Sequence, residues 1–189
     1  MSEPWPVIGG MIATGLPHPL LVPDQNAGWG RVRAGYEKAR QWLEDLNPDV
    51  LIVYSTMWPS VIGHQIQADP NPRWTHVDEL FHDLGSIPYD FRIDSEFAHE
   101  AAKAGVERGL MSRTVSYHGF PIDTGSVVAL KLLNPNNKFP ATILSSNVYA
   151  DRAETVVFAK SLVDALRNQG KRAVVVTIAS LSNRLFTDF

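Results

Sequence analysis

A histidine held between two prolines is the first residue in the chain whose type and setting suit chemistry. His18 lies in the stretch GLPHP, directly after an apolar segment that predicts a strand. The prolines fix the direction of the loop, and an imidazole can bind a metal ion or exchange a proton near neutral pH. A loop histidine that only hydrogen-bonds to backbone is the alternative, and the spacing leaves both interpretations open.

A sulfur side chain follows the second apolar segment. Met57 and Trp58 come shortly after DVLIVYS at 49–55. A first-row metal site favours imidazole or carboxylate ligands, whereas the thioether of Met57 is a soft donor. Packing therefore explains Met57 and Trp58 better than metal binding does. His64 lies further along the chain, in or beyond a possible strand.

A predicted helix start supplies a third candidate site. The stretch YHGFPIDTG at 117–125 contains His118 and places Asp123 and Thr124 at the beginning of a helix. Backbone N–H groups at a helix N-terminus can hold an anion or a polar ligand. Asp123 is also a favoured capping residue, and capping alone explains its presence, which slightly favours a structural role.

Hydroxyl and amide side chains accompany two further apolar segments. Ser146 and Asn147 end the segment that begins at residue 141, and Asn183 follows the segment at 172–179. An amide can bind a substrate, but Asn183 cannot act as a general base at neutral pH. The candidate residues are thus better suited to binding than to catalysis.

These candidates need a common scaffold, and the alternation of the predicted elements supplies one. Apolar runs rich in Val and Ile alternate with segments of helical period. This predicts a single α/β domain, residues 1–189, with a mostly parallel or mixed central sheet and helices on both faces. Ligands in such sheets bind outside the carboxyl ends of the strands, where the candidate residues would meet.

The element boundaries follow from periodicity and from capping residues. Ser95, Asp123 and Gly170 are the expected cap residues of three helices. Residues 69–89 are predicted to form a loop. The predicted strands are 7–14, 49–55, 61–68, 111–117, 141–146 and 172–179, and the predicted helices are 29–46, 95–109, 123–133 and 151–169.

Composition excludes several classes of function. The chain has 189 residues and a net charge of −3 without a basic cluster, which argues against a nucleic-acid groove. No apolar run approaches the roughly 18 residues that a membrane span needs. Cysteine is absent, which removes disulfides, thiolate metal sites and cysteine nucleophiles and agrees with a cytoplasmic location.

Several stretches together resemble a known family. These stretches are PHP, AGWGRVRAGYEKAR, PDVLIVYSTMW, FPIDTGSVVAL, SSNVYADRAE and KRAVVVTIASLSNRLF. In combination they resemble the class III extradiol dioxygenase superfamily, with most likeness to the alpha subunits of 2-aminophenol 1,6-dioxygenase. The resemblance runs from about residue 7 to residue 188.

The resemblance implies a set of site residues. Catalytic members hold Fe(II) with two histidines and one glutamate, and His18 matches the first histidine. Met57 stands where the second histidine is expected, and Asn183 stands where a catalytic histidine is expected. The glutamate comes from a segment beyond the position of Phe189, so the chain is expected to be C-terminally shortened relative to the family. His18 is then the single remaining metal ligand, and no catalytic residue is assigned.

Three functions follow from the resemblance. The first is an alpha-type, non-catalytic subunit in the breakdown of aromatic compounds, which is inactive alone, binds no cofactor, and either supports a beta-type catalytic partner carrying Fe(II) or self-associates. The second is a stand-alone pseudoenzyme that binds a small molecule in a relic cleft. The third is an active dioxygenase with a rearranged metal site, formed by His18 with His64 or His118. The expected cleft residues are His18, Met57, His118, Asp123, Thr124, Ser146, Asn147 and Asn183.

Overall fold

The computed structural model describes residues 4–180, which form eight strands and five α-helices with two short 3₁₀ turns. The strands are β1 (Val7–Ala13), β2 (Val50–Ser60), β3 (His64–Gln67), β4 (Arg73–Val77), β5 (Ser86–Asp90), β6 (Ser112–Val115), β7 (Ala141–Asn147) and β8 (Ala173–Ile178). The helices are α1 (His18–Leu21), α2 (Ala27–Leu46), α3 (Ser95–Glu107), α4 (Thr124–Leu133) and α5 (Arg152–Gln169), and the 3₁₀ turns are η1 (Pro23–Gln25) and η2 (His82–Leu84).

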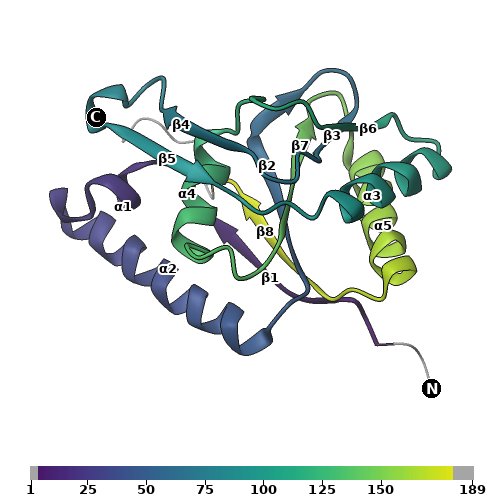
Figure 1. Ribbon diagram of the computed structural model, residues 1–189, viewed down its shortest axis with the longest axis horizontal. Helices are drawn as coiled ribbons and strands as arrows, with labels where there is room; N and C mark the ends of the chain where they lie inside the picture. The colour runs from purple at the N-terminus through teal and green to yellow at the C-terminus, as the bar shows by residue number, and fades with distance from the viewer. Residues whose placement is uncertain (1–3, 181–189) are drawn as a thin grey trace.

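A six-stranded sheet in the order β1-β8-β2-β7-β3-β6 forms the centre of the protein (Figure 1). Neighbouring strands are parallel except β3 and β7, which are antiparallel through Ile66 and Leu144. β4 and β5 form a separate antiparallel hairpin that contacts α4. The predicted α/β fold with a mixed central sheet is confirmed.

Helices cover both faces of the sheet, as the sequence predicts (Figure 1). Successive residues of a strand point to opposite faces, and β2 therefore feeds two cores. Leu51 and Val53 enter the core under α2 and α4, while Val50 and Ile52 enter the core under α3 and α5. All four side chains are buried, which explains the continuous apolar run that predicts this strand.

Capping residues set the beginnings and ends of the helices. Asp123 caps α4 by accepting from the Ser126 N–H, and Gly170 ends α5 in the left-handed region with φ of 62°. The prediction of Ser95 as the cap of α3 is wrong by one residue. Asp94 accepts from the Phe97 N–H, whereas the Ser95 hydroxyl donates to the Ala68 carbonyl.

The predicted loop at 69–89 is also wrong, because it contains β4, η2 and most of the β4–β5 hairpin. β4 is largely exposed, so it lacks the apolar alternation that marks a half-buried strand. β5 does alternate, with Ile87 and Tyr89 buried, but Pro88 between them weakens the strand signal.

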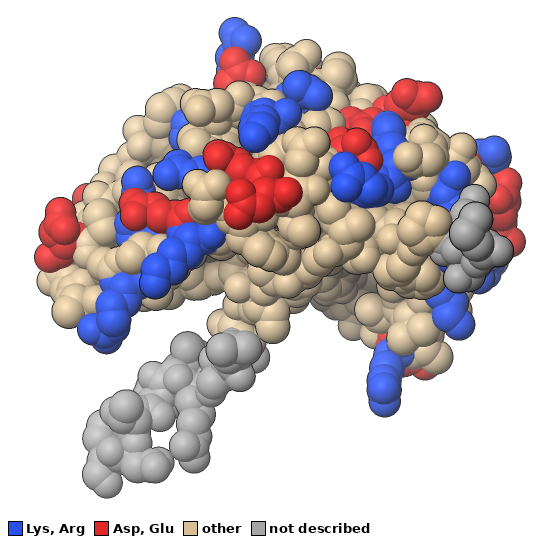
Figure 2. All heavy atoms as spheres, turned by 90° about the horizontal axis from the view of Figure 1, so that it is seen from below, with Lys and Arg blue, Asp and Glu red and all other residues tan. Residues whose placement is uncertain are grey.

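The surface facing the viewer in Figure 2 carries intermixed acidic and basic side chains rather than an area of one sign. This distribution agrees with the small net charge and with the absence of a basic cluster in the sequence. Among residues 4–180, no helix has the length and hydropathy that crossing a bilayer requires.

Candidate functional site

A bulge in β2 shapes the carboxyl edge of the sheet. Ser55 pairs with Ser145 of β7, and Pro59 pairs with the next residue, Ser146. Thr56, Met57 and Trp58 are therefore extra residues without partners in β7. Extra residues bend a strand and redirect its side chains. Met57 and Trp58 consequently reach different neighbours.

Met57 fills the space between the loop of His18 and the start of α4. Its sulfur lies so close to Gly15 and Gly125 that a Cβ at either glycine would overlap it. The neighbouring Thr56 hydroxyl donates to the Ile178 carbonyl at 2.8 Å, which ties the bulge to β8. The thioether thus packs against bare backbone on two sides, as the packing interpretation predicts.

His18 begins α1 and lies between two aromatic rings. It stacks on Trp29 with ring centroids 4.7 Å apart and meets the edge of Phe81 at 4.5 Å. Its Nδ1 is enclosed and has no hydrogen-bond partner among the described residues. Because Phe81 comes from the segment predicted as a loop, this contact was not predictable from the GLPHP stretch.

The Asp123 carboxylate accepts hydrogen bonds from other residues of the chain. Its Oδ1 accepts from the Ser55 hydroxyl at 2.8 Å and from the Ser126 N–H at 2.9 Å, and its Oδ2 accepts from the Ser126 hydroxyl at 2.7 Å. Ser55 and Ser126 are fully buried. Asp123 therefore joins the end of β2 to the start of α4, in agreement with a capping role.

Thr124 connects to two residues that sequence reasoning missed. Its hydroxyl donates to the Asp78 carboxylate, and because it has one proton, His76 Nε2 must donate to the same oxygen at 2.6 Å. Burial lowers the pKa of His76 despite the nearby negative charges. Burial alone would raise the pKa of Asp78, but the hydrogen bonds from Thr124, Phe81 and Leu80 lower it. His76 and Asp78 are two residues apart, and in an extended segment such residues lie on the same face. This spacing was the signal in the sequence that could have identified the pair.

Ser146, Asn147 and His64 make structural contacts. The Ser146 hydroxyl accepts from the Tyr54 hydroxyl at 3.2 Å. Asn147 Nδ2 and His64 Nε2 both donate to Glu154 Oε1, at 3.0 and 3.1 Å. His64 is buried and stacks on Phe158, and this burial lowers its pKa although Glu154 acts in the opposite direction.

His118 stays on the surface, with 75% of its side chain exposed and its Nδ1 3.3 Å from an Asp69 carboxylate oxygen. The structure thus brings the His18 loop, Met57 and the start of α4 together. It places His64 and His118 in separate contacts of their own. Asn183 lies outside the described residues.

The residues that the structure describes do not fit the Fe(II) that the resemblance implies. Within residues 4–180, no three His, Asp or Glu side chains are grouped to hold a metal ion. The Nδ1 of His18 is enclosed, and Met57 offers a thioether where iron requires a harder donor.

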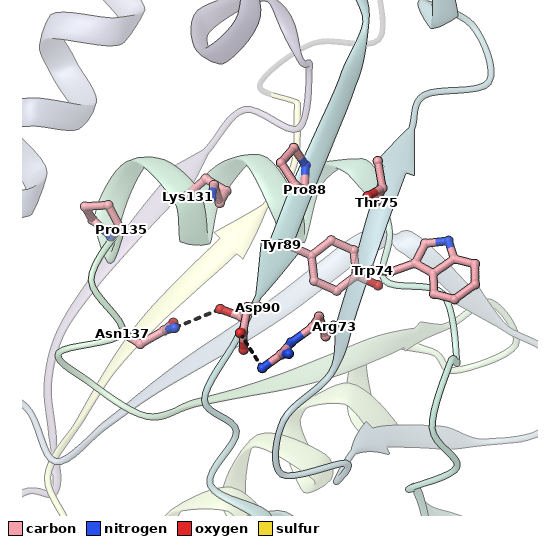
Figure 3. Close-up of a pocket in the computed structure, with 9 residues that line it drawn as sticks. All are labelled: Arg73, Trp74, Thr75, Pro88, Tyr89, Asp90, Lys131, Pro135 and Asn137. Atoms are coloured by element: carbon pink, nitrogen blue, oxygen red, sulfur yellow. Dashed lines mark hydrogen bonds and ion pairs between the residues drawn. The ribbon is translucent and has the colours of Figure 1, made fainter.

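A hollow of about 930 Å³ lies elsewhere, between the β4–β5 hairpin and α4 (Figure 3). None of the predicted site residues lines it. Arg73 pairs with Asp90 at 2.9 Å, and Asn137 donates to the Asp90 carbonyl at 2.7 Å. Because these polar groups satisfy one another, the hollow presents few free groups to a ligand.

Comparisons with known proteins agree with the fold and the resemblance. The chain is 31% identical over 182 residues to the 2-aminophenol 1,6-dioxygenase alpha subunit of Pseudomonas sp, covering 96% of this chain and 67% of that protein. It is 29% identical over 191 residues to the beta subunit from Pseudomonas sp, covering 94% of this chain and 63% of that protein. The chain therefore spans about two thirds of the length of these relatives.

A solved structure shares the fold. The crystal structure of an uncharacterized protein from Escherichia coli K12 matches with a TM-score of 0.58 and 19% identity, over 83% of this chain and 58% of that one. Residues 13–187 match the LigB family, described as the catalytic LigB subunit of aromatic ring-opening dioxygenase. The match covers most of the chain, and the chain belongs to the LigB family.

Proposed function

We propose that this chain is an alpha-type, non-catalytic subunit of an extradiol dioxygenase that cleaves aminophenol- or catechol-type rings. A beta-type partner carries the Fe(II) and performs the cleavage. Membership of the LigB family supports this assignment, as does similarity to the alpha and the beta subunits of one dioxygenase.

The placement of Met57 is the observation that carries the non-catalytic assignment. In the resemblance, this position belongs to an iron-binding histidine. Here a soft thioether occupies it and packs against Gly15 and Gly125. A side chain at either glycine would overlap the Met57 sulfur. The thioether therefore occupies the space that an iron-binding side chain would need.

The neighbouring polar groups support a scaffold role. The Asp123 oxygens are used by Ser55 and Ser126, and the Thr124 hydroxyl is used by Asp78 and His76. These bonds hold the end of β2, the start of α4 and the β4–β5 hairpin in fixed positions. A rigid edge of this kind suits a subunit that stabilises another protein.

Purification of the chain alone and with a beta-type catalytic subunit from the same host tests the proposal. We expect no oxygen consumption with 2-aminophenol or catechol from the chain alone. We expect the chain to raise the activity or thermal stability of the partner, and the iron measured by elemental analysis to follow the partner. Turnover by the chain alone would contradict the proposal. No effect on the partner would favour a small-molecule-binding pseudoenzyme instead.

The variant Met57→His tests whether the chain lacks a single iron ligand or the whole metal site. After anaerobic iron loading, we expect this variant to gain some metal affinity but no turnover, because a facial site also needs its other ligands. Met111→His is the matched control, since Met111 is also exposed but lies near Gly63 rather than near Gly15 of the His18 loop. Turnover by Met57→His alone would show that the chain supplies the remaining ligands.

A further inference from the structure

A hollow of about 640 Å³ lies next to the β2 bulge. It lies between the bulge and β6 with the turn that follows β6, and this volume is typical of small-molecule sites. Its lining includes Trp58, Ile62, Gln65, Arg113, Tyr117 and Phe120. Neither the resemblance nor the proposed function assigns a role to this hollow.

Three aromatic rings form one wall of the hollow. The ring of Phe120 lies 5.4 Å from that of Trp58 and 5.5 Å from that of Tyr117, measured between centroids. The Tyr117 side chain is 61% exposed, and Ile62 nearby is 55% exposed. A group of exposed apolar side chains around a concave surface is typical of a binding site.

A tight turn fixes two of these rings. The Phe120 N–H donates to the Tyr117 carbonyl at 3.3 Å, which closes a four-residue β-turn. Gly119, at the third position, has φ of 88°, a conformation that type II turns require and that favours glycine. The aromatic wall is thus arranged by the backbone before any ligand arrives.

Among the polar side chains that line the hollow are a cation and a fixed amide. Arg113 is exposed, and no Asp or Glu of residues 4–180 forms an ion pair with it. Gln65 is buried, and its Nε2 donates to the Ile62 carbonyl at 2.9 Å. The guanidinium can therefore bind an anion, and the orientation of the amide is set.

We propose that this hollow binds a planar aromatic anion, of which an aryl carboxylate is the simplest form. The ring would pack against Trp58, Tyr117 and Phe120, because aromatic pairs favour offset or edge-to-face contacts. The carboxylate would form a bidentate pair with Arg113, the geometry for which a guanidinium is suited. The site is separate from the residues of the proposed function and does not depend on a partner subunit.

Calorimetric titration of the chain alone with benzoate tests the site. We expect saturable binding of benzoate, with weaker binding of benzamide, which lacks the charge, and of cyclohexanecarboxylate, which lacks the planar ring. Arg113→Gln should weaken benzoate binding about tenfold or more, because the bidentate charge-assisted pair is lost, and leave benzamide binding unchanged. Tyr117→Ala should weaken the binding of both aromatic compounds.

Arg152→Gln is the matched control, because Arg152 is also exposed but does not line the hollow. It should bind benzoate as the unmodified chain does. The proposal fails if benzoate does not bind saturably, if Arg113→Gln leaves its affinity unchanged, or if Arg152→Gln weakens it equally. It also fails if benzoate binding is absent while Ile62→Asp dissociates an oligomer in sedimentation, because the hollow is then a protein interface.

Discussion

Met57 and Trp58 are consecutive residues of the β2 bulge, yet their surroundings differ. At Met57, which we call the filled side, the sulfur packs between Gly15 and Gly125, and His18 of the adjoining loop lies between two rings. At Trp58, which we call the open side, the ring borders an open hollow. A bulge sends neighbouring side chains to different environments, so one edge of a sheet can hold a filled position beside an open one.

This difference shows that a residue at the position of a family's metal ligand need not have the surroundings of a ligand. Met57 occupies the place that the resemblance gives to an iron ligand, yet its sulfur packs against the backbone of Gly15 and Gly125. The side with the exposed aromatic rings and Arg113, which forms no ion pair within residues 4–180, lies outside the residues that the resemblance names. Three substitutions break or sharpen this comparison.

Gly125→Ala should have the largest effect, because it acts on the filled side. The new Cβ would overlap Met57 and the Ile178 side chain, and overpacking of this kind costs about 1–3 kcal/mol. We expect the free energy of unfolding in urea to fall by about 2 kcal/mol, despite the better helix propensity of alanine.

Gly35→Ala provides the matched control. Gly35 is an exposed helical glycine with nothing within 4 Å of its Cβ position, so alanine should raise stability by about 0.5–1 kcal/mol. Adding Met57→Ala to Gly125→Ala should recover part of the loss. Purely additive losses would mean that the sulfur does not fill this space.

The sequence predicts the scaffold better than the site, for physical reasons. Val50 to Val53 are buried on both faces, and such strands show as continuous apolar runs. Asp123 and Gly170 act at helix ends through local geometry, which sequence reports directly. The strands of the central sheet, most of the helices and two of the caps were therefore predictable.

The contacts that define the site are long-range and leave little local signal. The bulge is hidden because it is defined by the pairing of β2 with β7, which the residues from Ser55 to Trp58 do not report. His76, Asp78 and Phe81 lie in a segment whose exposed strand resembles a loop, yet they contact Thr124 and His18. Asp94 lies one residue before the predicted Ser95, and both are good caps, so only the structure distinguishes them.

Lowering the pH should reduce the free energy of unfolding through His64, the residue before Gln65 of the hollow. Burial lowers the pKa of His64, and a second ring proton would lie on the enclosed Nδ1, which has no partner among the described residues. The pKa of His64 is lower in the folded protein than its unfolded value of about 6.5. The contribution of this histidine to the free energy of unfolding is therefore present above about pH 6.5 and lost as the pH falls below that value. His76 acts in the same direction.

Urea unfolding at pH 7.5 and 5.5 measures this effect. We expect a lower free energy of unfolding at the lower pH, and a smaller difference in His64→Gln, whose amide donates without titrating. His99→Gln is the matched control, since His99 is exposed. An unchanged pH dependence in His64→Gln would assign the effect to other groups, with His76 the first to examine.

Tyr117→Ala should have the smallest effect on stability, because it acts on the open side. The ring is 61% exposed, and surface substitutions away from caps and buried networks change stability by about 0.5 kcal/mol or less. We expect the urea midpoint to stay close to that of the unmodified chain while benzoate binding weakens. If Tyr117→Ala instead cost about as much as Gly125→Ala, the ring would be part of the core, and its exposure would need no ligand to explain it. A stable variant with impaired binding would show that the exposed rings are retained for contact with another molecule, since folding does not require them.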